Sequence, residues 1–353
     1  MEPAEVLRRL VARYSPSGRE GAAVREFVSI ARRLGYAASV DPVGNGIARR
    51  GRGRPRIVFL GHIDTVEGPR PVRRRAGRLH GRGAVDAKGA LAAALVAGGT
   101  FAGPGELSVV AAVGEETDSR GARHLVAHRR ADHLIVGEPS GWDGVTIGYK
   151  GELQLTARFR GRRTHYASPE PTTADVALAW AQAVRTVAEA RQTESLFASL
   201  TAKTVAVESR RRGDAESASV TVDFRLPPGL STDELLRRLP NEPGRPRLRV
   251  RVRAEPVEVD RANPTVAALT AGIRALGARP TLWRKSGTSD LNVALPVWSV
   301  PAAAYGPGDA RLDHTARESL SDADLERSVA VLRGAFERLA RGGPTPRRSA
   351  SGA

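Results

Sequence analysis

Histidine and acidic side chains recur in this chain directly after apolar segments or at the start of a predicted helix. In sheets built mainly from parallel strands, ligands gather at the carboxyl ends of the strands. Residues that follow different strands can therefore meet although they lie far apart in the sequence. The set comprises His62, Asp64, Asp86, Glu115, Glu116, Glu138 and His314.

Imidazole and carboxylate groups together are ligands for divalent metal ions. Two imidazoles and three carboxylates could hold two ions if one carboxylate bridges them. Glu115 and Glu116 are adjacent and would repel each other without a cation. Asp64 is a reasonable partner for the second ring nitrogen of His62, and an acid next to a ligand is free to act as general base.

Each of these residues taken alone has an ordinary structural explanation. Acids at strand ends and helix starts often cap the helix, and Asp86 in "GRGAVDAKG" by itself would be interpreted as such a cap. A lone histidine is more often a surface or core residue than a ligand. Helix caps do not explain why these acids come with His62 and His314 and with glycine-flanked turns.

The elements that must position these residues alternate between strand and helix patterns. "RIVFLG" is a continuous apolar run, typical of a strand buried on both faces, and the helix pattern "AKGALAAALVAGG" follows it. "LSVVAAVG", "SRGARHLVAH" and "HLIVG" then predict strand, helix and strand. This alternation predicts an α/β domain with a mainly parallel sheet.

The pattern changes after residue 148. "GELQLTARFRG" alternates polar and apolar residues, as a half-exposed strand does. The following segments predict the order β-α-β-β-α-β, which is typical of a small α+β domain. We therefore expect one domain from residues 1–148 and 259–342, an inserted domain over 149–258, and a disordered tail over 343–353.

Composition limits the chemistry and the partners. The chain has 353 residues and no cysteine, which excludes disulfides and thiolate ligands. Its net charge is +17, and only four of its 55 basic residues are lysine, so the charge reflects either a polyanionic partner or arginine-rich codon usage. No zinc-finger spacing or mixed basic and aromatic pattern indicates nucleic-acid binding. No segment predicts a signal peptide or a membrane span, so we expect a cytoplasmic protein.

These motifs resemble the co-catalytic zinc peptidases and deacylases, a family that includes acetylornithine deacetylase, succinyl-diaminopimelate desuccinylase and carboxypeptidase G. The resemblance rests on "GHIDTV", "GRGAVDAKG", "GEETDSRG", "GEP" and the late histidine, and it covers nearly the whole chain. It implies a zinc-peptidase-like catalytic domain that binds two Zn²⁺ per subunit, which Co²⁺ can replace. The implied roles are His62 and Glu138 on one ion, Glu116 and His314 on the other, Asp86 as the bridge, Glu115 as general base and Asp64 behind His62.

The resemblance also assigns a role to the inserted domain, as a lid and dimerisation domain of a homodimer. His165 matches the lid histidine that supports the oxyanion from the neighbouring subunit, with a surface histidine as the alternative. Arg225 and the loop residues Gly287, Thr288 and Ser289 match positions that bind a substrate carboxylate, although Arg225 could instead be a salt-bridged strand residue. Arg212 stands where many relatives have an oxyanion-supporting asparagine, which argues against a simple acetyl or succinyl substrate.

The stretch "GEPSGWDGVTIGYKG" is similar to a narrower branch of the family. That branch releases lysine or ornithine from the C-terminal glutamyl group of an acidic amino-group carrier protein during amino-acid biosynthesis. We therefore expect a metal-dependent amide hydrolase with this carrier as substrate. The alternatives are a deacylase of small N-acyl amino acids, a basic nucleic-acid-binding protein that is not an enzyme, and a metal-bound scaffold without activity, which would be expected to lack Glu115.

Overall fold

A computed structural model describes residues 1–342 of the chain, and the predicted disordered tail, 343–353, lies outside the described residues. The chain divides into two compact units. The first contains residues 1–148, 259–283 and the chain from Ser289 onward, and the second contains 149–258 and 284–288. The expected boundaries differ at one segment, because residues 284–288 belong to the second unit.

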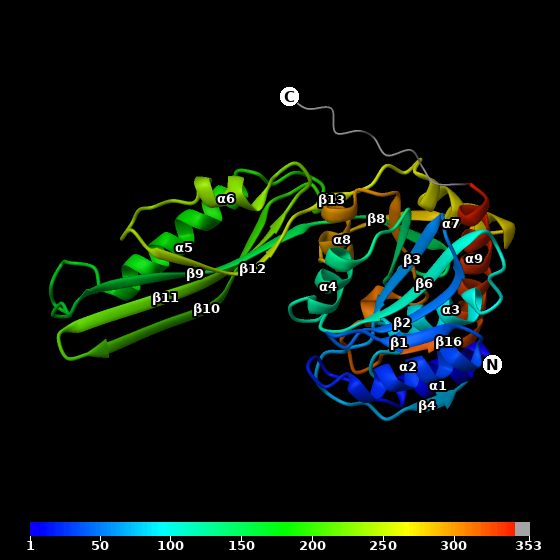
Figure 1. Ribbon diagram of the computed structural model, residues 1–353. Coiled ribbons are helices and arrows are strands. Elements are labelled where there is room, and N and C mark those ends of the chain that lie inside the picture. Colours follow the sequence, from blue (N-terminus) through cyan, green and yellow to red (C-terminus); the bar gives the residue numbers. More distant parts are fainter. Residues whose placement is uncertain (343–353) are drawn as a thin grey trace. The chain divides into compact units, whose positions relative to one another are not determined.

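The first unit is an α/β layer structure built on a large, mainly parallel sheet (Figure 1). Its strands lie in the order β1-β2-β6-β3-β7-β15-β8. Strand β3 pairs in parallel with both β6 and β7, and β7 pairs in parallel with β15. The bounds of these strands are β1 (Ala37–Val40), β2 (Gly46–Arg52), β3 (Arg56–His62), β6 (Gly105–Ala112), β7 (His133–Gly137), β8 (Gly144–Tyr149) and β15 (Ala302–Ala304).

Helices cover both faces of this sheet, and Figure 1 shows α4 and α8 on the opposite side from α3 and α9. Alternate residues of β3, Ile57 and Phe59, belong to the same core as helices α1, α2, α3, α7 and α9. Every residue of β3 after Arg56 is buried, which explains its uninterrupted apolar sequence. The bounds of the helices are α1 (Pro3–Val11), α2 (Gly21–Arg33), α3 (Lys88–Gly98), α4 (Arg120–His128), α7 (Pro264–Ala275), α8 (Asp290–Trp298) and α9 (Asp322–Arg341).

A small antiparallel sheet lies beside the helices of the first unit, in the order β16-β5-β4. It joins a hairpin near residue 75 to the segment that precedes α9. The sequence patterns did not predict it, because each of its strands has only three residues. These strands are β4 (Arg73–Arg75), β5 (Arg78–His80) and β16 (Ser319–Ser321), and a short 3₁₀ helix, η1 (Ala310–Leu312), precedes β16.

The second unit has the predicted element order, β-α-β-β-α-β. Its four-stranded antiparallel sheet has the order β10-β11-β9-β12. Buried residues such as Leu155, Val222 and Trp180 form a core between one face of the sheet and its two helices. The bounds are β9 (Gly151–Arg162), α5 (Thr173–Glu189), β10 (Thr201–Arg212), β11 (Ala215–Leu226), α6 (Thr232–Arg238) and β12 (Arg247–Ala254). The short strands β13 (Val257–Glu258) and β14 (Thr281–Lys285) belong to the large sheet that contains β8.

Candidate metal centre

Three adjacent parallel strands of the first unit end at residues of the predicted site. Strand β3 ends at His62, β6 leads through a glycine turn to Glu115 and Glu116, and β7 leads directly to Glu138. The carboxyl ends of β6, β3 and β7 are neighbours because these strands pair in that order. The sheet therefore brings together side chains from three separate sequence motifs.

Two further residues reach this edge from loops. Asp86 lies just before α3, and His314 lies between η1 and β16. The backbone of His314 has φ 60°, in the left-handed region that residues other than glycine rarely adopt. Such conformations cost energy and tend to occur at functional sites, where the surrounding structure maintains them.

Asp86 lies between the two histidines. Nε2 of His62 is 3.0 Å from Oδ1 of Asp86, and Nε2 of His314 is 3.1 Å from its Oδ2. His314 also contacts Glu116, with 3.0 Å between Nε2 and Oε1. Nε2 of His62 is 4.0 Å from Oε1 of Glu138. One carboxylate is thus shared by two groups of potential ligands.

The described residues contain three sets of potential metal ligands. Within each set, the ligand atoms all lie within 4.8 Å of one another. Asp86 belongs to two of these sets, and His62 also belongs to two. This donor set of imidazole nitrogens and carboxylate oxygens suits zinc or a similar divalent ion. The sets are His62 with Asp86 and Glu138, Asp86 with Glu116 and His314, and His62 with Glu115 and Glu116.

The electrostatics of the site show an excess of carboxylates that favours a cation. Burial raises the pKa of Glu115 well above its usual value, against the effect of His62, and the nearby carboxylates of Glu138, Asp290 and Asp86 raise it further. Hydrogen bonds to Asp86 and Glu116 raise the pKa of His314 to about 10. Without a metal ion, protonated imidazoles supply positive charge between these acids. A divalent cation would supply more, so the residues present fit a metal centre.

Asp64 is buried behind His62. Nδ1 of His62 is 3.0 Å from the backbone oxygen of Asp64 and 3.6 Å from its Oδ1. The carboxylate of Asp64 also accepts hydrogen bonds from the backbone N–H groups of Glu115 and Glu116, both at 3.1 Å. Asp64 therefore connects the orientation of His62 to the position of the acidic pair.

The N-terminal turn contributes a residue that the sequence analysis missed. Oγ of Ser17 donates a hydrogen bond of 2.7 Å to Oδ2 of Asp64. Ser15 supports the same segment, because its Oγ donates to the backbone oxygen of Ile63 at 2.7 Å. The sequence "YSPSG" lies between α1 and α2 and is typical of a turn, and no local pattern shows that its hydroxyls reach the end of β3.

Glu318 is a second residue that the sequence analysis missed. Its Oε1 accepts hydrogen bonds from the backbone N–H groups of Val85 and Asp86, at 3.0 and 3.2 Å. Its Oε2 pairs with Arg82 at 2.9 Å, and both side chains are buried. Glu318 thus joins the loop of Asp86 to the loop of His314, from which it is only four residues away.

Asp290 is a buried acid that contributes to the electrostatics of the site. It is 1% exposed, and burial raises its pKa to about 7, against the effect of His62. Asp290 in turn raises the pKa of Glu115. Its neighbour Ser289, predicted to bind substrate, is the N-cap of α8 and accepts a hydrogen bond from the backbone N–H of Leu291.

The other predicted site residues belong to the second unit. His165 lies in an exposed loop between β9 and α5, where its Nδ1 accepts a hydrogen bond from the backbone N–H of Ala167 at 3.2 Å. Arg225 forms salt bridges of 3.0 Å with both Glu152 and Asp223, as the alternative interpretation of this residue expected.

The loop of Gly287 and Thr288, which is predicted to bind substrate, reaches this group of charges. Oγ1 of Thr288 donates to Glu152 at 3.3 Å, and Gly287 has open space around its α-carbon. Burial raises the pKa of Glu152 to about 7, against the effect of Arg225. The structure thus brings Arg225 and Thr288 together around Glu152, a residue that the sequence analysis did not name.

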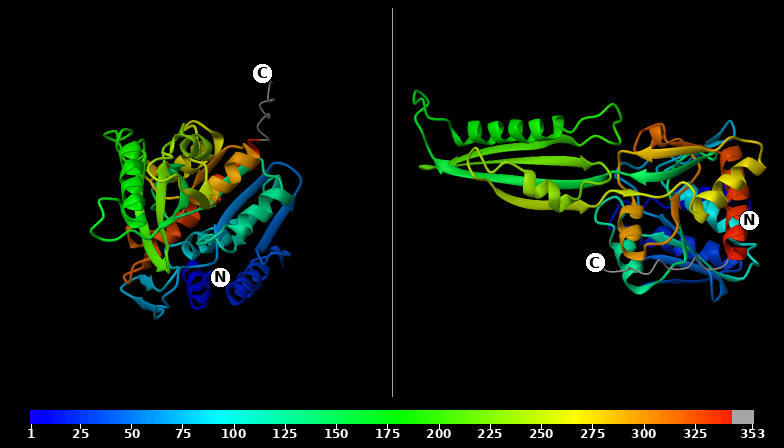
Figure 2. Two further views of the ribbon diagram at one scale, coloured as in Figure 1. Left: turned by 90° about the vertical axis from the view of Figure 1, so that its left-hand side faces the viewer. Right: turned by 90° about the horizontal axis from the view of Figure 1, so that it is seen from above.

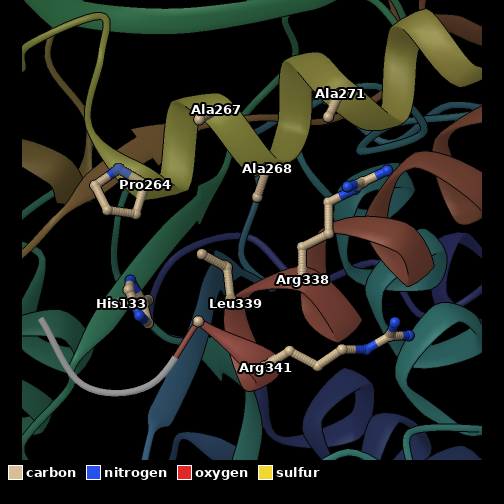
Figure 3. A pocket seen from close by; sticks show the side chains of 9 residues that line it. His133, Pro264, Ala267, Ala268, Ala271, Arg338, Leu339 and Arg341 are labelled. Carbon is tan, nitrogen blue, oxygen red and sulfur yellow. The ribbon is translucent and has the colours of Figure 1, made fainter.

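A separate pocket of about 550 Å³ lies in the first unit, between α7 and the end of α9 (Figure 3). His133, which lines this pocket, is the first residue of β7, so the pocket adjoins the amino end of a parallel strand. Ligands in such sheets bind at the carboxyl ends. The lining adds apolar side chains and the arginines Arg338 and Arg341 but no acid, so it does not resemble the metal centre. Among residues 1–342, no helix is both long and apolar enough to cross a membrane.

Comparisons with known proteins identify the family of the chain. The model of peptidase family M20/M25/M40 matches residues 58–338. A curated protein of Deinococcus radiodurans, named "[LysW]-lysine hydrolase", is 37% identical over 353 residues, which cover 96% of this chain and 97% of that protein. A protein of Thermococcus kodakarensis, provisionally named as a [LysW]-lysine/[LysW]-ornithine hydrolase, is 39% identical, over 96% of this chain and 92% of that protein.

Solved structures show the same fold at low sequence identity. An M20 family metallo-carboxypeptidase from Sulfolobus solfataricus aligns with a TM-score of 0.80 at 16% identity, over 97% of this chain and 100% of that chain. Both units of the present chain are therefore included in the alignment, and the likeness concerns the fold.

Proposed function

This chain belongs to peptidase family M20/M25/M40, and on that premise we propose that it releases lysine or ornithine from the C-terminal glutamyl group of LysW, an acidic amino-group carrier protein. The observation that carries this proposal is the cluster of potential metal ligands and acidic side chains around Asp86, in a chain whose relatives are named for this reaction over nearly their whole length. The proposal explains why these residues, far apart in sequence, lie together.

We further propose two zinc ions per subunit, which cobalt can replace. His62 and Glu138 would hold one ion, Glu116 and His314 the other, and Asp86 would bridge them. This assignment agrees with the two ligand sets that share Asp86. When bound, such ions acidify water and polarise the amide carbonyl.

Glu115 is the proposed general base, because it is the acid of the Glu115–Glu116 pair that does not contact His314. It takes a proton from the attacking water, whose oxygen adds to the amide carbonyl. The carbon–nitrogen bond then breaks, and Glu115 passes the proton to the amino group that leaves with lysine. In the metal-free chain, burial raises the pKa of Glu115; bound cations would favour its deprotonated form, which then accepts a proton more readily than an exposed glutamate.

The remaining predicted residues have proposed roles in substrate binding and in the dimer. His165 would stabilise the oxyanion from the neighbouring subunit of a homodimer, as the family resemblance implies. Its exposed position in a loop of the second unit is compatible with such a role. Arg225, Gly287, Thr288 and Ser289 would bind the carboxylate of the amino acid, with Arg225 exchanging part of its present contact with Glu152 for the substrate.

A comparison of substrates tests the proposed function. The purified protein is assayed on LysW that carries an amide-linked lysine, beside acetyl-lysine, acetylornithine and succinyl-diaminopimelate, with Glu115→Gln as the inactive control. We expect kcat/KM to be highest for LysW-linked lysine. Higher efficiency on one of the small acylated amino acids would replace this proposal with that of a small-molecule deacylase.

A further inference from the structure

One face of the four-stranded sheet in the second unit is open. Core residues from α5 and α6, including Trp180 and Leu235, pack against alternate residues of the strands, such as Leu155 and Val220. Figure 2 shows α5 along one side of these strands. The residues between these core positions, which include Thr156, therefore point to the other face.

Arginines dominate this open face. In the pairing of β12 with β9, Arg247 lies directly opposite Arg158, and Arg249 lies opposite Thr156. In the pairing of β9 with β11 and β11 with β10, Ser217 lies between Arg160 and Arg210. Arg251 reaches the same face, because its Nε donates to Oγ1 of Thr156 at 3.2 Å. We call this surface the arginine face, defined by Arg158, Arg160, Arg210, Arg247, Arg249 and Arg251, all of them exposed.

This arrangement does not favour the stability of the sheet. Like charges directly opposite each other on neighbouring strands are destabilising, and Arg158 and Arg247 form such a pair. Within residues 1–342, the salt bridge that involves the arginine face joins Arg210 to Glu208 at 3.4 Å, between two well-exposed side chains. Further along the same strands, by contrast, Arg225 is paired with two acids. The charge of the arginine face is therefore left for an external partner.

The arginine face is also hollowed. A depression of about 310 Å³ is lined by Arg158, Arg160 and Arg210, together with Glu208 and small residues of β11 that include Ser217 and Ser219. Guanidinium groups bind carboxylates through two parallel hydrogen bonds, so this surface suits acidic side chains that project from a partner.

We propose that the arginine face is the surface on which the acidic carrier protein LysW docks. This inference rests on the proposed function, which makes LysW the substrate. The aromatic side chains of β9 to β12, Phe159 and Phe224, are buried in the core of the unit, whereas binding of single-stranded nucleic acid uses exposed aromatic rings for stacking. Glu208 within the depression would also repel a phosphate backbone. An acidic folded protein therefore fits better than a nucleic acid.

The hairpin of β4 and β5 offers less free charge. It is also rich in arginine, but Arg74 pairs with Asp322 at 2.7 Å and Arg78 donates to Ser319. The arginine face thus has more unpaired arginines than this hairpin. The paired strands fix the spacing of the backbone positions that carry these arginines, which suits a partner whose acids have a matching spacing.

Direct binding of LysW tests the proposal apart from catalysis. The affinity of fluorescently labelled LysW without lysine is measured for the wild type and for two double variants, Arg158→Gln/Arg247→Gln and Arg160→Gln/Arg210→Gln. The control is Arg185→Gln/Arg237→Gln, which removes the same charge from exposed positions on α5 and α6. We expect both face variants to weaken binding roughly tenfold or more, and the wild-type affinity to fall with added salt.

The same variants are assayed on a short glutamyl-lysine amide, which has the scissile bond without the acidic protein. We expect kcat/KM for this amide to be unchanged in all variants. Equal weakening of LysW binding in face and control variants, or no weakening, would overturn the proposal. So would weaker binding of duplex DNA in the face variants with LysW binding intact.

Failure of the proposed function is recognised separately. The proposed function fails if the wild-type protein does not release lysine from LysW that carries it, whatever the result with the arginine variants. Binding of LysW that depends on the arginine face would support the docking surface even then. Release of lysine from LysW with binding insensitive to the face variants would leave the proposed function intact and overturn the docking surface alone.

Discussion

The imidazoles of His62 and His314 approach opposite oxygens of the same carboxylate, that of Asp86, at 3.0 and 3.1 Å. A carboxylate that is approached from both sides in this way is placed to bridge two cations. The other acids of the site divide accordingly, with Glu138 beside His62 and Glu116 beside His314. The following predictions test the consequences of this arrangement.

Removal of metal ions should abolish activity reversibly. Because Asp86 is shared by two of the three ligand sets, we expect two zinc-like ions per chain in metal analysis of the purified protein. Dialysis against a chelator should remove both ions and the amide hydrolase activity, and zinc or cobalt should restore it. A protein without bound metal that retains full activity would contradict the proposed chemistry.

Separate substitutions of the two adjacent glutamates should distinguish the general base from the metal ligand. Glu115→Gln should keep the metal ions and lower kcat by about 10²–10⁴-fold, because a general base acts in the transition state. Glu116→Gln should instead reduce metal affinity, since Glu116 contacts His314. Metal content and kcat are measured for both variants, and the opposite pattern would reverse the two assignments.

Loss of the carboxylate behind His62 should weaken the site without unfolding the protein. Asp64→Asn removes the charge that orients His62 and accepts hydrogen bonds from the acidic pair. We expect a loss of about 10–100-fold in metal affinity or activity, as is typical for residues that hold metal ligands. Asp260→Asn makes the same chemical change in an exposed loop and should have no such effect. Equal behaviour of the two variants would remove Asp64 from the site.

The stability of the metal-free protein should depend on His314 at alkaline pH. Hydrogen bonds with Asp86 and Glu116 raise the pKa of His314 in the folded protein to about 10, from 6.5. The folded state thus binds a proton more tightly than the unfolded state. This contribution to stability is fully present below pH 6.5 and is lost as the pH rises toward 10.

Thermal unfolding in the presence of a chelator measures this effect. Between pH 7 and pH 10 the Tm of the wild type should fall more than that of His314→Gln, which has no titrating ring. Parallel pH profiles for the two proteins would show that His314 is not protonated more readily in the folded state.

Removal of His165 should affect turnover and not folding. The side chain is exposed, so His165→Ala should leave Tm unchanged, but it should lower kcat far more than it changes KM if the imidazole supports the oxyanion. His128→Ala, at another exposed histidine, is the matched control. Mixing His165→Ala with Glu115→Gln subunits should restore some activity if His165 acts across a dimer. An absence of rescue, with subunit exchange demonstrated, would argue against that arrangement.

Much of the site could be predicted from the sequence because its residues follow recognisable strands. His62, Glu115 and Glu138 each come directly after an apolar run, and the parallel pairing of these strands places them at one edge. The order of elements in the second unit was equally clear, because its strands alternate polar and apolar residues around two helical patterns. Local pattern and tertiary structure agree in both cases, since burial on one or both faces of a sheet dictates which residues are apolar.

Only the tertiary structure shows which distant loops support the site. Ser17 and Glu318 lie in segments that read as ordinary turns, and their hydrogen bonds to Asp64 and to the backbone of Asp86 join parts of the chain that no local pattern relates. Asp290 likewise follows the loop residues predicted to bind substrate, and its burial near Glu115 became visible only in the folded chain.

The charge of the chain likewise depends on sequence for its amount and on tertiary structure for its distribution. The sequence by itself determined that the protein is strongly basic, but codon usage and a polyanionic partner predict the same composition. Strand register decided the distribution, because it sets Arg247 opposite Arg158 on one open face while Arg225, on the same sheet, is neutralised by Glu152 and Asp223. Composition determines how much charge a protein has, whereas the pairing of strands determines which charges meet a partner within the protein and which remain exposed.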